Sequence, residues 1–391
     1  MDVLSSSPSK RLKGDAAEAA SSSSSSSSST SACRVAPVEQ VSPNVFLNAA
    51  WQGDDATIAS ALRDPLLDHN KKGHRGLTAL ILGAFRGHAS VVTLLLADDR
   101  VDPNIANQDG NTALITAAWK GHDSVVHLFL SNDRVDPNFA NRDGMTAVHI
   151  AAYNGHASVV TLLLADKRVD PTIITQEGET ALTRAVFEGR DSVAKLLLVD
   201  KRVDPNFPRE DGSTALVIAA ACAHTSTVEL LLADERVDPN IADGDGDTAL
   251  AFAVVKQDLQ LVKLLLAHKL LDPNIANLRG KNALSRGAEE GGSAILELII
   301  ADHRTIRTRP PNHHMHARAA YDTALRNVKR SRNARFRGLT RLMVAFRRMR
   351  LRAAQTVYAP GGTGFAAAAA SFNAAAASAA AGGNGNGNGS S

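Results

Sequence analysis

The side chains of this chain best suited to chemistry are histidines that recur at a fixed interval. His88, His122 and His156 each follow a glycine and stand 34 residues apart. Imidazole is a common metal ligand, but one imidazole in each of several stacked units is better explained by a hydrogen bond to the neighbouring turn. The tract from His313 to His316 resembles a metal site only in composition, because it follows two prolines and has no cysteine or matching acid nearby. We therefore expect neither a metal nor any other cofactor.

The patterns that mark common catalytic sites are missing from the sequence. There is no G-x-x-x-x-G-K-[ST], G-x-S-x-G, H-E-x-x-H or Cys-x-x-Cys. Only about 85 residues follow position 305, and many of them are of low complexity. Because an ordinary catalytic domain needs more chain than that, we expect that the protein is not an enzyme.

The two ends of the chain have the composition of disordered segments. Residues 1–40 contain an unbroken serine run from Ser21 to Ser29, and residues 356–391 are mostly Ala, Gly, Asn and Ser. Neither segment has enough apolar variety to offset the entropy lost on ordering. We predict a disordered N-terminal tail over 1–40 and a disordered C-terminal tail over 356–391.

Charge is distributed unevenly between the tails. From Arg304 to Arg352 there are fifteen Lys or Arg against one acid, Asp322, which leaves +14. Residues 1–40 balance, and the whole chain carries +3, so residues 41–303 carry −11. An acidic body is therefore joined to a basic arm, which we place at 306–355.

Cysteine use and hydropathy indicate an intracellular protein, cytoplasmic or nuclear and not secreted. Cys33 and Cys222 are too few for a disulfide framework. No integral membrane segment or secretion signal is expected, since no run of about 18 strongly apolar residues occurs. Lys10, Arg11 and Lys13 have the spacing of a nuclear import signal, so nuclear import stays open.

An internal repeat of 34 residues dominates the body. The first position of a T-A-[LV] triplet falls at Thr78, Thr112, Thr146, Thr180, Thr214 and Thr248, with Asn282 in the seventh place. Within one unit, Asp109-Gly110 predicts a tight turn, Thr112 an N-cap, and Gly121 a break before a second helix. Asp136-Pro137 ends that helix. A degenerate first copy fits upstream, with Ser42 as N-cap and Pro43 as the first helical residue.

The repeated elements D-G-x-T-A-L, A-A-x-x-G-H, V-V-x-L-L-L and D-P-N resemble the ankyrin repeat. The resemblance implies an all-α solenoid of about eight stacked helix-turn-helix units with hairpin-like loops over residues 41–305. Three departures are visible: Ala replaces the usual Pro after Thr, the His of that motif survives only at His149, and the loop before Asp-Pro carries one residue more than usual. We expect these changes to alter loop shape and not the fold.

Five consecutive units carry an aromatic residue in the same slot, which the resemblance places at the end of the first helix, facing a concave groove. Such rings anchor partners at interface centres; alternatively, each ring only packs on its neighbour and covers helix ends. Two adjoining slots vary along the array, which we interpret as exposed recognition positions. The residues predicted to contact a protein partner are Trp51, Phe85, Arg86, Asn111, Trp119, Lys120, Met145, Tyr153, Asn154, Phe187 and Glu188.

The basic arm has the pattern of an amphipathic helix between Phe336 and Leu351. Three interpretations are open: attachment to nucleic acid or an anionic membrane, insertion into a calmodulin-like groove, and a C-terminal cap on the acidic body. The arginines predicted to contact an anionic partner are Arg335, Arg337, Arg341, Arg347, Arg348, Arg350 and Arg352.

The resemblance implies a monomeric scaffold or adaptor that binds a protein partner through the concave face of its repeats. The alternative is a nuclear regulator whose arm binds nucleic acid or an acidic partner while the repeats recruit proteins. The sequence does not identify the partner.

Overall fold

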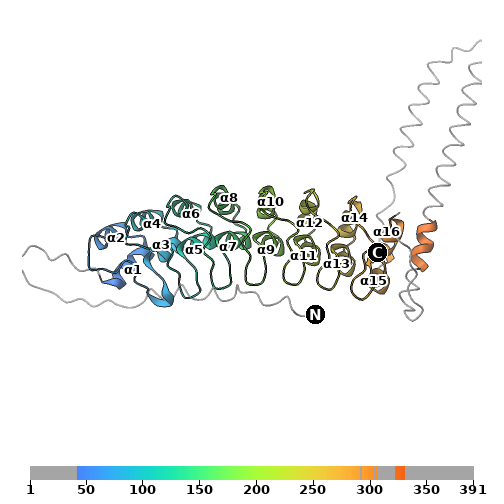
Figure 1. Ribbon diagram of the computed structural model, residues 1–391, viewed down its shortest axis with the longest axis horizontal. Helices are drawn as coiled ribbons and strands as arrows, with labels where there is room; N and C mark the ends of the chain where they lie inside the picture. Colours follow the sequence, from blue (N-terminus) through green and yellow to red (C-terminus); the bar gives the residue numbers. More distant parts are fainter. Residues whose placement is uncertain (1–41, 291–292, 303, 306–321, 331–391) are drawn as a thin grey trace, which may run out of the picture.

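The repeats form two layers of short antiparallel helices. This computed structural model describes residues 42–290, 293–302, 304–305 and 322–330, and within these ranges it contains helices and two isolated bridges but no strand. In each unit a first helix and a second helix pack against one another, and the loops project from the first layer (Figure 1).

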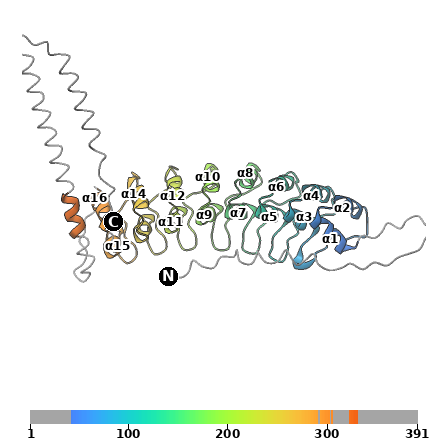
Figure 2. The ribbon, with the colours of Figure 1, turned by 180° about the vertical axis from the view of Figure 1, so that it is seen from behind.

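The first layer holds one helix from each repeat, and these helices number the repeats 1 to 8. They are α1 (Pro43–Gln52), α3 (Ala79–Arg86), α5 (Ala113–Lys120), α7 (Ala147–Asn154), α9 (Ala181–Phe187), α11 (Ala215–Ala221), α13 (Ala249–Val255) and α15 (Ala283–Glu290). The second layer lies beside the first along its whole length (Figure 2). Its members are α2 (Asp55–Ala61), α4 (Ala89–Leu96), α6 (Asp123–Leu130), α8 (Ala157–Ala165), α10 (Asp191–Val199), α12 (Thr225–Leu232), α14 (Leu259–Ala267) and α16 (Ser293–Ala301). A single 3-10 turn, η3 (His74–Gly76), lies in the loop before α3.

The predicted start signals and the stop at Gly121 are confirmed, whereas α6 ends at Leu130, with Ser131 as its C-cap, and not at Asp136-Pro137. Thr112 Oγ1 accepts a hydrogen bond from the amide of Ile115 and caps α5, while Gly121 ends that helix with a φ of 72°. In the degenerate first repeat, Ser42 caps α1 and Pro43 is its first residue. Each helix is only seven to ten residues long, too short to be stable alone, so its stability comes from packing.

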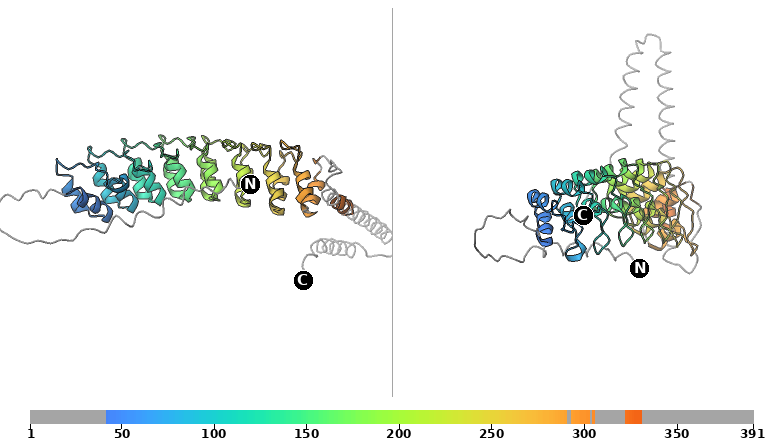
Figure 3. Two further views of the ribbon diagram at one scale, coloured as in Figure 1. Left: turned by 90° about the horizontal axis from the view of Figure 1, so that it is seen from below. Right: turned by 60° about the vertical axis from the view of Figure 1, so that its left-hand side comes forward.

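The core runs unbroken from repeat to repeat. Small alanines of the first helices, such as Ala117 and Ala118, are fully buried, as are Val125, Val126 and Phe129 of the second helix. Figure 3 shows the repeats arranged side by side along one axis, so that each contacts only its neighbours. A solenoid of this kind gains stability from its repeat-to-repeat interfaces.

The loop with one extra residue carries an arginine that joins neighbouring repeats. Arg236 of repeat 6 donates to the carbonyl oxygens of Leu198 and Val203 in repeat 5, at 2.5 and 2.9 Å, and pairs with Asp234 at 2.7 Å. The same position reaches back to the preceding repeat at Arg100, Arg134, Arg168, Arg202 and Arg304. The departure from the usual repeat length thus keeps the fold and adds a bridge across each of these junctions.

A further helix over 322–330 closes the end of the solenoid beyond α16 (Figure 1). Ala324 and Val328 are buried in the same core as the repeats. Asn327 Nδ2 donates to Glu297 Oε1 of α16 at 2.7 Å. Residues 322–330 of the basic arm therefore cover the end of the array, while the cap interpretation of the amphipathic segment from Phe336 to Leu351 concerns residues outside the described ranges.

Several sequence-based predictions concern residues outside the described ranges. These are the two tails, the import signal at Lys10, Arg11 and Lys13, and the amphipathic segment with its seven arginines. The disorder of the tails, and the nucleic-acid and calmodulin-like interpretations of the arm, stay predictions.

Candidate functional site

The five aromatic residues lie together at the ends of successive first helices, and we call them the aromatic row: Trp51, Phe85, Trp119, Tyr153 and Phe187. Every ring of the row is half-buried. Because the chain places them on α1 to α9 at one position per repeat, they form a line across five neighbouring helices.

Three rings of the row contact one another. Trp51 stacks on Phe85 with ring centroids 5.6 Å apart and an interplanar angle of 18°. Phe85 meets Trp119 at 5.8 Å with a tilt of 49°. These distances are in the range of favourable aromatic pairs. The interpretation that the rings pack on their neighbours is therefore correct for these three, and the packing leaves part of each ring exposed.

Two cations cover the faces of the same rings. The Arg86 guanidinium lies 4.8 Å from the centroid of the Trp51 ring. Lys120 Nζ lies between two rings, 4.3 Å from Phe85 and 4.1 Å from Trp119. Partial burial lowers the pKa of Lys120 from its ordinary value. Further along the row, the Arg184 guanidinium lies 5.6 Å from the Tyr153 ring.

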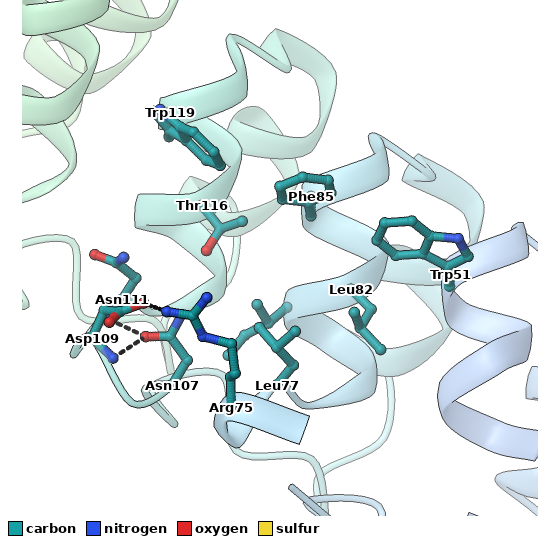
Figure 4. A pocket seen from close by; sticks show the side chains of 11 residues that line it. Trp51, Arg75, Leu77, Leu82, Phe85, Asn107, Asp109, Asn111, Thr116 and Trp119 are labelled. Carbon is teal, nitrogen blue, oxygen red and sulfur yellow. Dashed lines mark hydrogen bonds and ion pairs between the residues drawn. The ribbon is translucent and has the colours of Figure 1, made fainter. Parts of the chain in front are cut away.

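A pocket of about 80 Å³ opens beneath the first three rings (Figure 4). Leu77, Ile81 and Leu82 supply its apolar floor. Its polar wall consists of loop residues and one helix residue: Arg75, Asn107, Asp109, Asn111 and Thr116. Sites for drug-sized molecules span roughly 300–1,000 Å³, so this pocket suits one side chain of a larger partner.

Hydrogen bonds within the loops hold the polar wall in place. Asn107 Oδ1 accepts from the amides of Asp109 and Asn111, both at 2.9 Å. Arg75 and Asp109 form an ion pair at 3.9 Å. The pocket is therefore built by two neighbouring loops together with the helices above them.

The recurring histidines position the residues of the aromatic row. Nε2 of His88, His122 and His156 each lies 3.1 Å from the backbone carbonyl oxygen of the row residue one repeat earlier, namely Trp51, Phe85 and Trp119. The predicted hydrogen bond to the neighbouring repeat is confirmed. Among the residues that the structure describes, no group of three or more His, Cys, Asp or Glu side chains is placed to hold a metal ion.

One of the two slots that we interpreted as exposed is buried, so that expectation is wrong at Asn111 and Met145. These residues are only 9% and 6% exposed. The following repeat contacts both: Asn141 Nδ2 of its loop donates to Asn111 Oδ1 at 3.0 Å, and Arg184 of helix α9 approaches the Met145 sulfur to 4.0 Å. Variation in this slot thus reflects matching between neighbouring repeats.

The other varying slot remains accessible. Arg86 is exposed, while Lys120, Asn154 and Glu188 are half-buried at the ends of their helices. Asn154 Nδ2 donates to the carbonyl oxygen of Ile150 at 2.8 Å. These four side chains border the aromatic row, as predicted from their adjacency in sequence.

A buried ion cluster in repeats 5 and 6 was not predicted. Glu179 is 3% exposed and pairs with Arg184 at 2.8 Å and Arg209 at 3.5 Å. Burial raises the pKa of Glu179, and the two guanidinium groups oppose that rise. The available signal was an arginine, Arg184, at a position of the first helix where repeats 2, 4, 6 and 7 carry apolar residues. Repeat 8 has Arg286 there, which also pairs with a carboxylate, that of Asp247 in the preceding repeat, at 2.5 Å.

Comparison with known proteins agrees with this architecture. The family model described as ankyrin repeats (3 copies) matches residues 46–141, 126–209, 194–277 and 216–309. The chain therefore belongs to the ankyrin-repeat family. Ankyrin repeats are generally protein–protein interaction modules, and proteins built from them are typically non-enzymatic scaffolds.

A crystal structure of EF0377, an ankyrin repeat protein, is similar to part of the chain, with 27% sequence identity and a TM-score of 0.46. The match covers 49% of this chain and 97% of that one. No curated protein matched the sequence. In the described ranges, no helix is long and apolar enough to cross a membrane.

Proposed function

We propose that this protein is a scaffold or adaptor that binds a protein partner along the aromatic row of repeats 1 to 5. The observation that carries the proposal is the row itself, in which five half-exposed rings occupy one position of consecutive repeats. Large rings at the centre of a surface are the residues that most often dominate binding energy. The later repeats carry Ala221 and Val255 in this slot, so the docking half is the N-terminal one.

The contact set that follows from the geometry differs from the sequence-based one. The five rings, Arg86, Lys120, Asn154 and Glu188 remain in it. Asn111 contributes through the pocket wall, whereas Met145 acts through its packing against Arg184 of helix α9 in repeat 5. No role in binding is proposed for the second-layer helices.

Affinity purification with matched variants tests the proposal. The full chain is compared with Tyr153→Ala, Trp119→Ala and the control Lys195→Ala, which changes an exposed residue of the second-layer helix α10. We expect both aromatic variants to lose the retained partner and the control to keep it. A truncated hot-spot ring costs about 2 kcal/mol or more in binding, or roughly thirtyfold.

Thermal unfolding separates lost binding from lost folding. Trp119→Ala removes the contact with Phe85 at 5.8 Å, which costs roughly 0.5–1.5 kcal/mol of stability. Tyr153→Ala removes a ring that sits beside Arg184 and is expected to cost less. Partner binding that survives in both folded variants would sink the proposal.

A further inference from the structure

The surface around the first three rings of the aromatic row carries three cations, although the repeat body as a whole is acidic. Arg86 and Lys120 lie on the rings, and Arg75 lies in the pocket wall. In the slot of Arg86 and Lys120, repeats 5 and 8 carry Glu188 and Glu290. Residues 41–303 together carry −11, so the cations around the pocket stand out against an acidic body, and Lys256 of repeat 7 is a cation of the same slot that lies away from the pocket.

The pocket between these cations is apolar on two sides. Trp51, Phe85 and Trp119 form one side, and the leucine and isoleucine floor forms the other. Its only carboxylate, Asp109, pairs with Arg75 at 3.9 Å. A volume of about 80 Å³ is near half of the roughly 150 Å³ cavity that accommodates benzene, which suits the end of one aliphatic side chain.

Each of the first three rings already has a ring or a cation packed against it. Trp51 and Phe85 are stacked on one another, Arg86 covers Trp51, and Lys120 covers Phe85 and Trp119. Single-stranded nucleic acid binds such platforms by stacking its bases on free ring faces. This arrangement therefore favours a protein segment, whose side chain enters the pocket past the ring edges, over a nucleobase.

Resting on the proposed function, we infer that the partner docks an acidic segment with a central aliphatic side chain. That side chain enters the pocket between Trp51, Trp119 and the leucine floor. Carboxylates on either side of it pair with Arg86 and Lys120. Opposite charges on the two surfaces fix the alignment of the partner and raise the association rate more than they raise the affinity.

Tryptophan fluorescence of the full chain tests the inference directly, because the only two tryptophans of the sequence, Trp51 and Trp119, both line the pocket. The probe is a synthetic octapeptide with a central Leu flanked by Glu and Asp and with no aromatic residue. Two control peptides carry Ala at the centre or Lys in place of the acids. We expect a saturable change in emission with the acidic Leu peptide and weaker binding of both controls.

Charge reversal in matched positions gives the second measurement. The pair Arg86→Glu and Lys120→Glu is expected to weaken the acidic Leu peptide about tenfold. Lys256→Glu changes the same slot in repeat 7, away from the pocket, and is expected to leave binding unchanged. Circular dichroism confirms that each variant is folded.

Several outcomes overturn the inference. Equal binding of the Lys peptide, or an undiminished affinity after charge reversal, contradicts the acidic chemistry. Stronger quenching by an oligouridine probe than by the peptide contradicts the choice of a protein segment. If affinity purification still shows that Tyr153 and Trp119 are needed while the charge reversals have no effect, the groove binds proteins and only the inferred partner chemistry fails.

Discussion

At the scale of single residues, His149 shows how one position of the repeat has become sensitive to pH. It is 1% exposed, and its Nδ1 lies 3.3 Å from the amide of Thr146 and 2.9 Å from Thr146 Oγ1. Because Nδ1 accepts the amide hydrogen, the neutral ring is the form that caps α7. Burial, with a smaller contribution from the charge of Arg184, lowers the pKa of His149 from 6.5 to about 4.

We predict that the repeats lose stability in acid because of this histidine. A pKa that is lower in the folded state than in the unfolded state means that protonation favours unfolding. The stability contributed by His149 is complete above about pH 6.5 and is lost as the pH falls towards 4, with a slope approaching 1.4 kcal/mol per pH unit at about its steepest.

The variant His149→Thr supplies the comparison, since Thr183 stands at the equivalent position of repeat 5 and accepts from the Thr180 amide at 2.9 Å. The variant keeps a hydroxyl that can cap α7, and its side chain at position 149 does not titrate between pH 4 and 7. Urea unfolding at pH 7, 6, 5 and 4 should show a flatter pH dependence for the variant. Parallel curves for the two proteins would contradict the assignment to His149.

At the scale of elements, the junctions between repeats are not equivalent. In repeats 2 to 6 and in repeat 8, the loop arginine donates to carbonyl oxygens of the preceding repeat. Repeat 7 carries Leu270 at the position of this arginine, and Leu270 is 67% exposed. Repeat 7 also has Asp258 in place of the bridging histidine. Asp258 caps its own helix by accepting from Gln260 and Leu261, both at 3.0 Å. In the described part of the chain, both bridges are therefore missing between repeats 6 and 7.

Restoring one bridge should stabilise the C-terminal repeats. In Leu270→Arg, the new guanidinium can reach the carbonyls of Leu232 and Val237, as Arg236 reaches Leu198 and Val203 one repeat earlier. An aspartate two residues before is not required, because Arg134 follows Asn132 and still bonds Leu96 at 2.6 Å. We expect a gain of about 1 kcal/mol.

Hydrogen exchange of α13 to α16 measures that gain locally. The control is Leu270→Lys, which adds charge and removes the exposed leucine but has no planar group to bridge two carbonyls. Protection should increase clearly more for Arg than for Lys. An equal effect of the two substitutions would show that the bridge is not the cause.

At the scale of the whole molecule, an open solenoid must cover its two apolar ends. The first repeat is closed by α1, whose outer side chains include the exposed Val45 and polar residues such as Asn44 and Asn48. The last repeat is covered by the helix at 322–330, through Ala324 and Val328. A polar, solvent-facing terminal unit is what keeps repeat arrays soluble.

Substitution inside the cap contact tests its importance without truncating the chain. Val328→Asp places a carboxylate where a side chain is 7% exposed, which should cost roughly 1–3 kcal/mol. The matched control is Lys329→Asp on the exposed side of the same helix. We expect faster proteolysis and earlier thermal unfolding of repeat 8 in the first variant. Identical behaviour of both would show that this helix does not stabilise the array.

Much of the architecture followed from the sequence because each repeat encodes its own signals locally. The Thr112 cap, the break at Gly121 and the Ser42-Pro43 start depend on neighbours within a few residues. The 34-residue step then brings equivalent positions side by side, so the His88 bridge and the aromatic row could be anticipated as well.

Only the tertiary structure decided the features that depend on which residues the neighbouring repeat carries. Asn111 and Met145 are buried against the next repeat, and a repeat pattern does not state which positions a neighbour covers. The pocket combines Leu82, Arg75 and Asp109, which lie on different elements. The burial of Val328 in the core of the repeats depends on how the helix at 322–330 packs, which no local signal specifies. Local sequence signals thus determined the helices of each repeat, and packing between neighbouring repeats decided which side chains are exposed.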